Sequence, residues 1–421
     1  MTDMTDAMHL SATDEHSTAQ ITNDPRDVGG ARLQQAVLRL GRHPVLRKAM
    51  MDLLKRAESQ LGYAGPVRED VTGPIVDALH GDDDRYEKTL ADGTKFNFLF
   101  RSKIARDFLM SDEERPNHVW EPQTTKLLLN LSHGLDGDVV VGGAYFGDQA
   151  ILVARTLAQK HTVHCFEPNP DQATMLAGNV NLNRLNNVLV NKVGLWSHSN
   201  VRLKLDGFDS FANAISASAH DKDAFSTVTI DDYRAQRRAK VGLIQLDIEG
   251  AEYGALLGAH KTLAEDKPHV IFEVHRHYVD WSHGLAQTDI CRYLAGLGYT
   301  LFAVRDFNSH IDMGSRPIEL IPVDKVYLTG PPHGFNMLAV QDPSRVQGAG
   351  FHTVENVSPK LLVHKNPALH HPVGGLHHPV GGLHHPVGGL HHPVGDLHHP
   401  VGGLHHPVGG LSQLVNALRS D

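Results

Sequence analysis

The stretch VVVGGAYFGD, residues 139–148, decides the fold that we expect for this chain. Three valines form a strand of the buried type, and Gly142, Ala144 and Gly147 then occupy the positions of a G-x-G-x-x-G motif with alanine in the middle. Glycine allows a sharp turn and lets a ligand approach the main chain closely. We therefore interpret the stretch as a strand, a tight turn and a helix start that face a ligand. The pattern alone is weak evidence, since many tight turns between a strand and a helix have similar sequences.

Strand-like and helical patterns alternate on both sides of this stretch, from residue 138 to residue 340. Such alternation predicts an α/β fold with a doubly wound, mostly parallel sheet. The strands are expected at residues 138–142, 162–166, 188–192, 241–247, 269–275 and 299–305, with edge strands at 322–328 and 335–340. Helices are expected between most of them, for example at residues 149–159 and 251–264.

Changes in composition divide the rest of the chain into segments. Polar, acidic residues at the N-terminus are typical of a disordered leader, and the apolar residues that follow have helical spacing interrupted at Gly41 and Pro44, which predicts two short helices. The unit LHHPVGG occurs six times near the C-terminus, with Asp396 as its single departure, and its proline and glycines oppose a helix. In order, we expect a leader at 1–29, a helical N-terminal region at 30–88, the Rossmann-like domain at 89–342 beginning with a hairpin around Asp92-Gly93, a linker at 343–368, a low-complexity tail of repeats at 369–410 and a C-terminal end at 411–421.

Composition limits the class of protein. The chain has 421 residues, of which 41% are hydrophobic, and Lys+Arg 39 against Asp+Glu 48 gives a formal net charge of -9. This balance argues against a surface built mainly to bind nucleic acid phosphates. The two cysteines, Cys165 and Cys291, exclude a disulfide framework and favour a reducing compartment. With neither a signal peptide pattern nor a long apolar run, we expect a cytoplasmic protein without a nucleic acid or membrane partner.

A glutamate follows the second strand of the expected sheet. Glu167 lies in the stretch HCFEPNP at 164–170, 24 residues after Gly143. An acidic residue at the tip of the second strand can accept hydrogen bonds from both hydroxyls of a ribose. Together with the glycine turn, it predicts a nucleoside site.

Further ionisable residues follow the fourth and fifth strands, at the edge where open α/β sheets bind ligands. The stretch LDIEGAE at 246–252 brings three carboxylates there, and one of its two glutamates could instead favour the start of the next helix through the helix dipole. The next strand ends in FEVHRH at 272–277, where Glu273 or His275 could be a buried structural partner. No spacing among these groups demands a metal site.

These pieces, in this order, resemble the FkbM family of S-adenosylmethionine-dependent methyltransferases. The resemblance runs from about residue 120 to residue 340, and its motifs are WEP at 120–122, FEPNP at 166–170, TIDD at 229–232 and DIEGAE at 247–252 followed by LLGA at 256–259. It implies the class I methyltransferase fold, with a seven-stranded sheet that has one antiparallel strand. It also implies S-adenosylmethionine as cofactor and methyl transfer to an oxygen of a small-molecule or sugar-containing metabolite.

The first motif departs from the family pattern. The family usually carries Asp-Val-Gly-Ala-Asn, and this chain has VGGAY at 141–145, so the Asp and the Asn are both missing. Those polar groups commonly help to hold the amino-acid portion of the cofactor. Glu121 and Asp148 are the candidates to replace them.

The resemblance also implies roles for the remaining residues. Glu167 would hold the ribose, and Gly143, Ala144 and Gly147 would line the cofactor. The candidates for acceptor binding and proton removal are Asp247, Glu249 and His275. The ordinary pKa of histidine, about 6.5, suits His275 to the role of base.

Two other classes of function remain open at this point. The chain could be a nucleoside-binding protein that has lost methyl transfer, with the histidine-rich tail binding metal or a partner; the altered first motif favours this. It could also be a nicotinamide oxidoreductase, which Glu167 fits but the stretch DIEG at 247–250 does not. For the tail itself, neutral expansion of a repeat, weak divalent metal binding and a docking or substrate strip are the alternatives.

Overall fold

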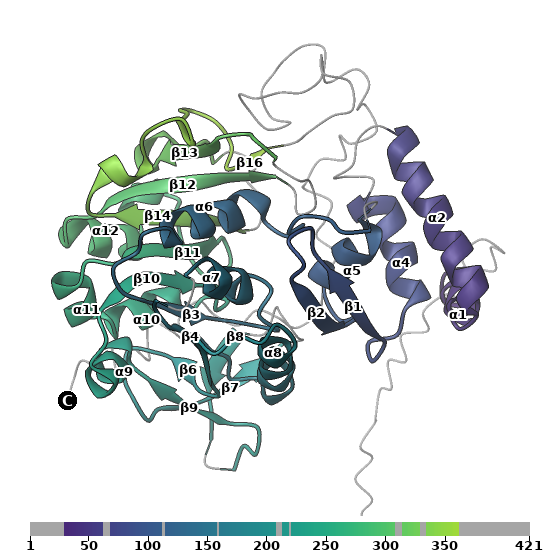
Figure 1. Ribbon diagram of the computed structural model, residues 1–421, viewed down its shortest axis with the longest axis horizontal. Helices are drawn as coiled ribbons and strands as arrows, with labels where there is room; N and C mark the ends of the chain where they lie inside the picture. The colour runs from purple at the N-terminus through teal and green to yellow at the C-terminus, as the bar shows by residue number, and fades with distance from the viewer. Residues whose placement is uncertain are drawn as a thin grey trace, which may run out of the picture.

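The computed structural model describes residues 29–61, 68–111, 114–157, 160–207, 213–218, 220–307, 314–328 and 334–361. Figure 1 shows a large sheet with helices on both faces, and a smaller part with helices and a hairpin beside it. The expected leader, except for its last residue, and the repeats at 369–410 and the C-terminal end at 411–421 lie outside the described residues.

Within the described residues, the central sheet has ten strands. Five neighbours run parallel: β5 (Val188–Asn191), β4 (Val163–Phe166), β3 (Asp138–Gly142), β10 (Val241–Leu246) and β11 (His269–His275). The strand β14 (Gly334–Val340) then lies antiparallel between β11 and β12 (Thr300–Phe307). The strands expected at 138–142 and 269–275 are confirmed with the same bounds, and the others in this set differ by one or two residues at an end.

The sheet continues past the seven strands that the family resemblance implies. The strand β13 (Ile318–Pro322) pairs antiparallel with β12, and β15 (Phe351–Thr353) pairs with β13. The strand β16 (Lys360–Leu361) lies on the other side of the end of β12. Two expectations are therefore corrected. The edge strand expected at 322–328 lies instead at Ile318–Pro322, so that the two ranges share only Pro322. The segment 343–368, expected to be a linker, contributes β15 and β16 to the sheet.

Helices cover both faces of the sheet (Figure 1). Along β3, Val139 and Val141 pack in one core and Val140 in the other, so the strand is buried on both sides. This explains its continuous run of valines, which is typical of doubly wound sheets. One face carries α6 (Pro122–Ser132), α7 (Ala150–Thr156) and α8 (Pro170–Leu182); the other carries α9 (Ile230–Arg237), α10 (Glu252–Leu257), α11 (His260–Glu265) and α12 (Asp289–Gly296). The single helix expected at 251–264 is thus two helices.

The N-terminal part joins the main domain through one continuous core. It contains α1 (Gly29–Gly41), α2 (Pro44–Leu61), the π-helical turn η1 (Arg68–Thr72), α4 (Gly73–Leu79), the hairpin β1 (Arg85–Thr89) and β2 (Lys95–Leu99), and α5 (Lys103–Met110). Phe98 of the hairpin stacks on Phe146 of the main domain at 6.0 Å between ring centroids. The backbone N–H of Asn97 donates to the Asn179 side chain at 2.7 Å. No helix in this described part, or in the rest of the described chain, combines the length and apolar character needed to cross a membrane.

A second, four-stranded sheet lies between β5 and α9 in the chain, and no sequence pattern predicted it. It contains β6 (Gly194–Leu195), β7 (Arg202–Asp206), β8 (Asn213–Ser216) and β9 (Phe225–Val228). Figure 1 shows these strands beside β4, below the main sheet in that view.

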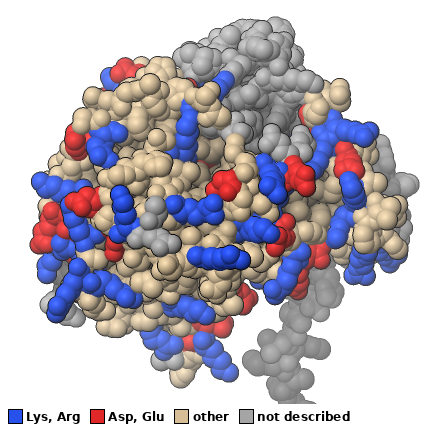
Figure 2. All heavy atoms as spheres, in the orientation of Figure 1, with Lys and Arg blue, Asp and Glu red and all other residues tan. Residues whose placement is uncertain are grey.

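The surface charge is uneven. Figure 2 shows Lys and Arg over both the main domain and the N-terminal helices, with Asp and Glu between them. The net charge of -9 therefore does not describe this face of the molecule. Only the overall composition of the chain speaks against a nucleic acid partner.

Candidate functional site

A cavity of about 180 Å³ lies at the carboxyl edge of the parallel strands. The segments that follow β3, β4 and β10 form its floor, and side chains of the second sheet form part of its wall. The cavity brings together seven of the residues expected from the sequence: Glu121, Gly143, Ala144, Asp148, Glu167, Asp247 and Glu249. It does not include the other two, Gly147 and His275.

Two glycines of the first motif are required for different reasons. Gly143 has φ 72°, and a Cβ placed on it would lie 1.7 Å from the carbonyl oxygen of Asp247. Only glycine lets the turn after β3 come this close to the loop after β10. Gly147 has φ 92°, and its Cβ would lie 2.5 Å from Leu176 Cδ1, so this glycine allows α8 to pack closely and does not line the cavity.

Glu167 is held rigidly at the cavity wall. The backbone N–H of Tyr145 donates to its Oε2 and that of Asn169 to its Oε1, both at 2.9 Å, and the residue is 7% exposed. Tyr145 stands where the family has asparagine, and its φ of 48° is the left-handed conformation that asparagine adopts more readily. Each carboxylate oxygen has two lone pairs, so Glu167 can still accept hydrogen bonds from a ligand.

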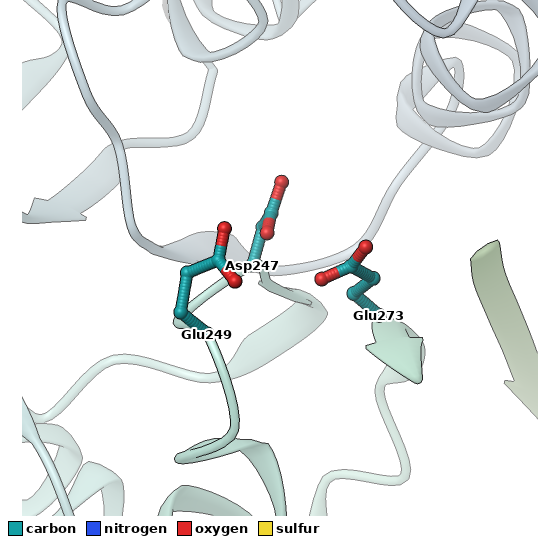
Figure 3. Close-up of side chains that lie close together, drawn as sticks. All are labelled: Asp247, Glu249 and Glu273. Carbon is teal, nitrogen blue, oxygen red and sulfur yellow. The ribbon is translucent and has the colours of Figure 1, made fainter. Parts of the chain in front are cut away.

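Three carboxylates converge at the floor of the cavity. Figure 3 shows Asp247 and Glu249, from the segment after β10, and Glu273, from β11, turned toward one another. One oxygen from each lies within 4.8 Å of the others. Burial raises the pKa of Asp247 to about 6 and that of Glu249 to about 8, and it raises the pKa of Glu273 well above its usual range. Repulsion from Asp148 adds to the shift of Asp247, and repulsion from Asp247 and other neighbouring carboxylates adds to the shifts of Glu249 and Glu273.

This group of carboxylates can act in two ways. A carboxylate whose pKa lies near neutrality can take a proton from a substrate hydroxyl, because it is ionised and still basic at working pH. Three oxygen ligands at this separation are also the donor type that Mg²⁺ prefers. Glu273 therefore belongs to the site, whereas the sequence left open whether it is a structural partner.

Glu121 lies next to this group and is positioned by distant strands. Its Oε2 accepts a hydrogen bond of 2.7 Å from Asn336 of β14, and burial raises its pKa to about 8. Glu121 directly precedes α6, whose first backbone N–H groups, those of Gln123 and Thr124, donate to the Asp306 carboxylate of β12 at 3.0 and 2.9 Å. Strands from the C-terminal half of the domain thus fix this residue of the cavity.

Glu252 has the structural role that the sequence left open for Glu249 or Glu252. Its carboxylate accepts the backbone N–H of Ile248 at 2.8 Å and that of Gly250 at 3.0 Å, and it closes the turn before α10. Glu249, with φ 51°, faces the cavity instead.

His275 is turned to its own loop. Its ring contacts the rings of His277 and Tyr278, with centroids 4.7 and 5.4 Å away, and its Nδ1 accepts the backbone N–H of His277 at 3.2 Å. Glu273, two residues earlier on the same strand, reaches the cavity where the sequence placed His275. The role of base assigned to His275 therefore lacks support from its position.

Some residues of the cavity were missed from the sequence. Gln245 of β10 lines it, as do Trp120 and apolar side chains of the second sheet such as Leu203, Leu205 and Phe225. Leu203 and Leu205 alternate with charged residues in the stretch RLKLD at 202–206, which is a short strand signal that could have found them. Gln245 gave no signal of its own, because it reads as one polar residue in an apolar strand.

Comparison with known proteins gives one family match. Residues 142–301 match the model of the methyltransferase FkbM domain. No curated protein matches the chain.

Solved structures show only distant likeness. Methyltransferase FkbM from Methylobacillus flagellatus KT is 16% identical over 48% of this chain and 43% of its own, with a TM-score of 0.31, so the match spans less than half of that protein. TYW2 of M. jannaschii, in complex with AdoMet, is 14% identical over 62% of this chain and 86% of its own, with a TM-score of 0.30. TYW2 of P. horikoshii, in complex with MeSAdo, is 12% identical over 63% of this chain and 74% of its own, with a TM-score of 0.32.

Proposed function

We propose, from the match of residues 142–301 to the methyltransferase FkbM domain, that the protein transfers a methyl group from S-adenosylmethionine to an oxygen of a small-molecule or sugar-containing acceptor. The observation that carries the proposal is the cavity at the carboxyl edge of the sheet. One wall of the cavity holds the fixed carboxylate of Glu167, and its floor holds the carboxyl groups of Asp247, Glu249 and Glu273.

The residues present fit the cofactor. Glu167 offers two fixed acceptors for a pair of ribose hydroxyls. Gly143 has no side chain, so a ligand can lie directly against the backbone of the turn after β3. Leu203, Leu205 and Phe225 supply an apolar wall for an aromatic base. Asp148 and Glu121 supply acceptors for the amino-acid portion. The cofactor, when bound, supplies an activated methyl group together with its leaving group.

The chain's own part in the reaction is to orient the acceptor and to take its proton. Asp247 is the base that we assign, because its pKa of about 6 makes it ionised above that pH and leaves it basic enough to remove a hydroxyl proton. Glu249 and Glu273 hold the acceptor by hydrogen bonds, which suits a substrate with several hydroxyl groups. The second sheet excludes water from one side of the cavity.

A second candidate function is a nucleoside-binding protein without methyl transfer. The specific observation in its favour is the first motif, where the buried Val141 and Tyr145 stand in place of the polar residues of the family. Cofactor binding with no product in any acceptor assay would support it.

The test combines calorimetry with a transfer assay. Glu167→Ala should weaken binding of S-adenosylhomocysteine by about 1–3 kcal/mol, because ribose hydroxyls lose their acceptors. Asp247→Asn should lower methyl transfer, followed as release of S-adenosylhomocysteine in an acceptor screen, far more than cofactor affinity. Glu265→Ala, at an exposed residue paired with Arg234, is the matched control and should change neither. A wild-type protein that binds no S-adenosylhomocysteine would refute the proposal.

A further inference from the structure

A chain of five buried side chains begins and ends at the cavity. Its members are Asp148, His118, Thr125, Gln149 and Gln245, and each is between 4% and 8% exposed. Asp148, Gln149 and Gln245 line the cavity, whereas His118 and Thr125 lie behind it. The family match covers three of the five, because His118 and Thr125 precede residue 142.

The contacts along the chain are continuous. His118 Nε2 lies 3.1 Å from Asp148 Oδ2, and His118 Nδ1 lies 3.1 Å from the hydroxyl of Thr125. The amide nitrogen of Gln149 donates to the same hydroxyl at 3.1 Å, and the amide nitrogen of Gln245 donates to Gln149 Oε1.

The chemistry of the groups gives this chain a direction. A carboxylate can only accept, so His118 Nε2 carries a proton and donates it to Asp148. The Thr125 oxygen accepts from Gln149, and its hydroxyl proton faces His118 Nδ1, which is closer than the Trp120 carbonyl oxygen at 3.3 Å. In this arrangement every donor points from Gln245 toward Asp148, with Nε2 of His118 as the donor to the carboxylate.

Both ends of the chain are consequently acceptors on residues that line the cavity. At one end is the Asp148 carboxylate; at the other, Gln245 Oε1 is buried and has no hydrogen-bond partner in the described part of the chain. A buried carbonyl oxygen without a donor is costly, and in native proteins such an atom calls for an explanation, of which a bound water, ion or ligand is one. An ammonium group, a cation with three N–H donors, is the ligand chemistry that suits a carboxylate and a carbonyl oxygen of this kind.

We propose that Asp148 and Gln245 together receive the ammonium group of the cofactor's amino-acid portion, and that His118, Thr125 and Gln149 are positioning residues that replace the polar groups missing from the first motif. The inference rests on the proposed function, since it assigns one end of the cofactor. It accounts for how VGGAY at 141–145 can serve a cofactor site without the aspartate and asparagine of the family.

The experiment compares two probes by calorimetry. S-adenosylhomocysteine carries the ammonium group, and 5′-methylthioadenosine has the same nucleoside without the amino-acid portion. Gln245→Met and His118→Phe should each weaken S-adenosylhomocysteine about tenfold or more and leave 5′-methylthioadenosine within about twofold. Phenylalanine keeps the ring packing of His118 against Phe108, whose centroid lies 6.0 Å away. His118→Gln, which restores an N–H donor toward Asp148, should recover most of the loss.

His164→Phe is the matched control. His164 is also a buried histidine bonded to an aspartate, Asp138, at 2.9 Å, but it lies outside the cavity wall. Its variant should change affinity for neither probe, while its thermal unfolding reports the stability cost of losing such a pair.

The outcomes separate this inference from the proposed function. A wild-type protein that binds neither probe refutes the proposed function. A wild type that binds both probes equally, or variants that weaken both equally, overturn the inference and leave a nucleoside site in place. If His118→Phe does not fold, the Gln245→Met result decides, because that variant leaves the histidine in place.

Discussion

Glu249 combines a left-handed backbone with a carboxyl group that resists ionisation. Burial, aided by the charges of Asp247 and Glu252, raises its pKa to about 8 from an ordinary 4.5. Between these two values the folded protein keeps a proton that the unfolded chain has lost. The free energy of unfolding therefore falls as the pH rises through this window.

Glu249→Gln should remove this part of the pH dependence. A glutamine resembles the protonated glutamate, so the variant should match the wild type near pH 4.5 and be more stable than the wild type at pH 8. Urea unfolding midpoints across this range measure the difference. The urea midpoints of the exposed control Glu265→Gln should change with pH as those of the wild type do. The same pH dependence in Glu249→Gln would contradict the raised pKa of Glu249.

At the scale of single residues, the sequence predicted correctly only those site residues whose position follows from the end of a strand. Glu167 and Asp247 follow strands directly, so their place at the carboxyl edge follows from the topology. The sequence favoured His275 over Glu273 as a candidate base, but the two lie on one strand two residues apart, and the loop that places His275 against His277 has no sequence signal. The chain from Asp148 to Gln245 could not be predicted either, since Gln149 and Gln245 are 96 residues apart.

Among the elements, the π-helical turn η1 stands out because it carries a buried cation. Arg68 donates to Glu58 of α2 through Nε at 3.0 Å and to Asp107 of α5 at 3.1 Å. Its side chain is 5% exposed, and those of Glu58 and Asp107 are 9% and 0% exposed. One residue therefore joins two helices of the N-terminal part through a buried cluster of three charged groups.

Arg68→Met should cost about 3–5 kcal/mol of unfolding free energy, because two buried carboxylates lose their cation. Lys48→Met is the matched control: Lys48 pairs with Asp52 one turn away at an exposed position, and its loss should cost about 0.5 kcal/mol or less. Urea unfolding of the full chain measures both. An equal decrease of the unfolding free energy in the two variants would show that the buried charges stabilise the fold no more than an exposed ion pair does.

Elements buried on both faces were the easiest to predict. The strands β3 and β11 are built around apolar runs, VVV at 139–141 and VIF at 270–272, and their bounds match the expected ones. The second sheet was missed because its strands have only two to five residues, and the alternation of RLKLD at 202–206 in β7 is too brief to predict a sheet by itself. The strands β15 and β16 have three and two residues and are defined by pairing with β13 and β12, which no local pattern reveals.

For the molecule as a whole, the histidine repeats at 369–410 remain a proposal. They hold 12 of the 31 histidines, and neutral imidazole suits Zn²⁺ and Ni²⁺. Deleting them should abolish weak Zn²⁺ and Ni²⁺ binding while S-adenosylhomocysteine binding persists. Titration with Mg²⁺ is the matched probe, since this ion prefers oxygen ligands over imidazole and its response should not change with the deletion. Unchanged Zn²⁺ and Ni²⁺ binding would leave neutral expansion as the explanation of the repeats.

The anchoring of α6 by Asp306, and of Glu121 by Asn336, bears on how this protein can be recombined with others. A chimera that grafts residues 142–301 into another scaffold would carry Glu167 and Asp247. It would leave behind Glu121, together with Asn336 of β14 and Asp306 of β12, which hold Glu121 and α6 in place. The recognisable family segment is therefore smaller than the unit that can be exchanged. A crossover that respects the site begins before residue 118 and ends after β16.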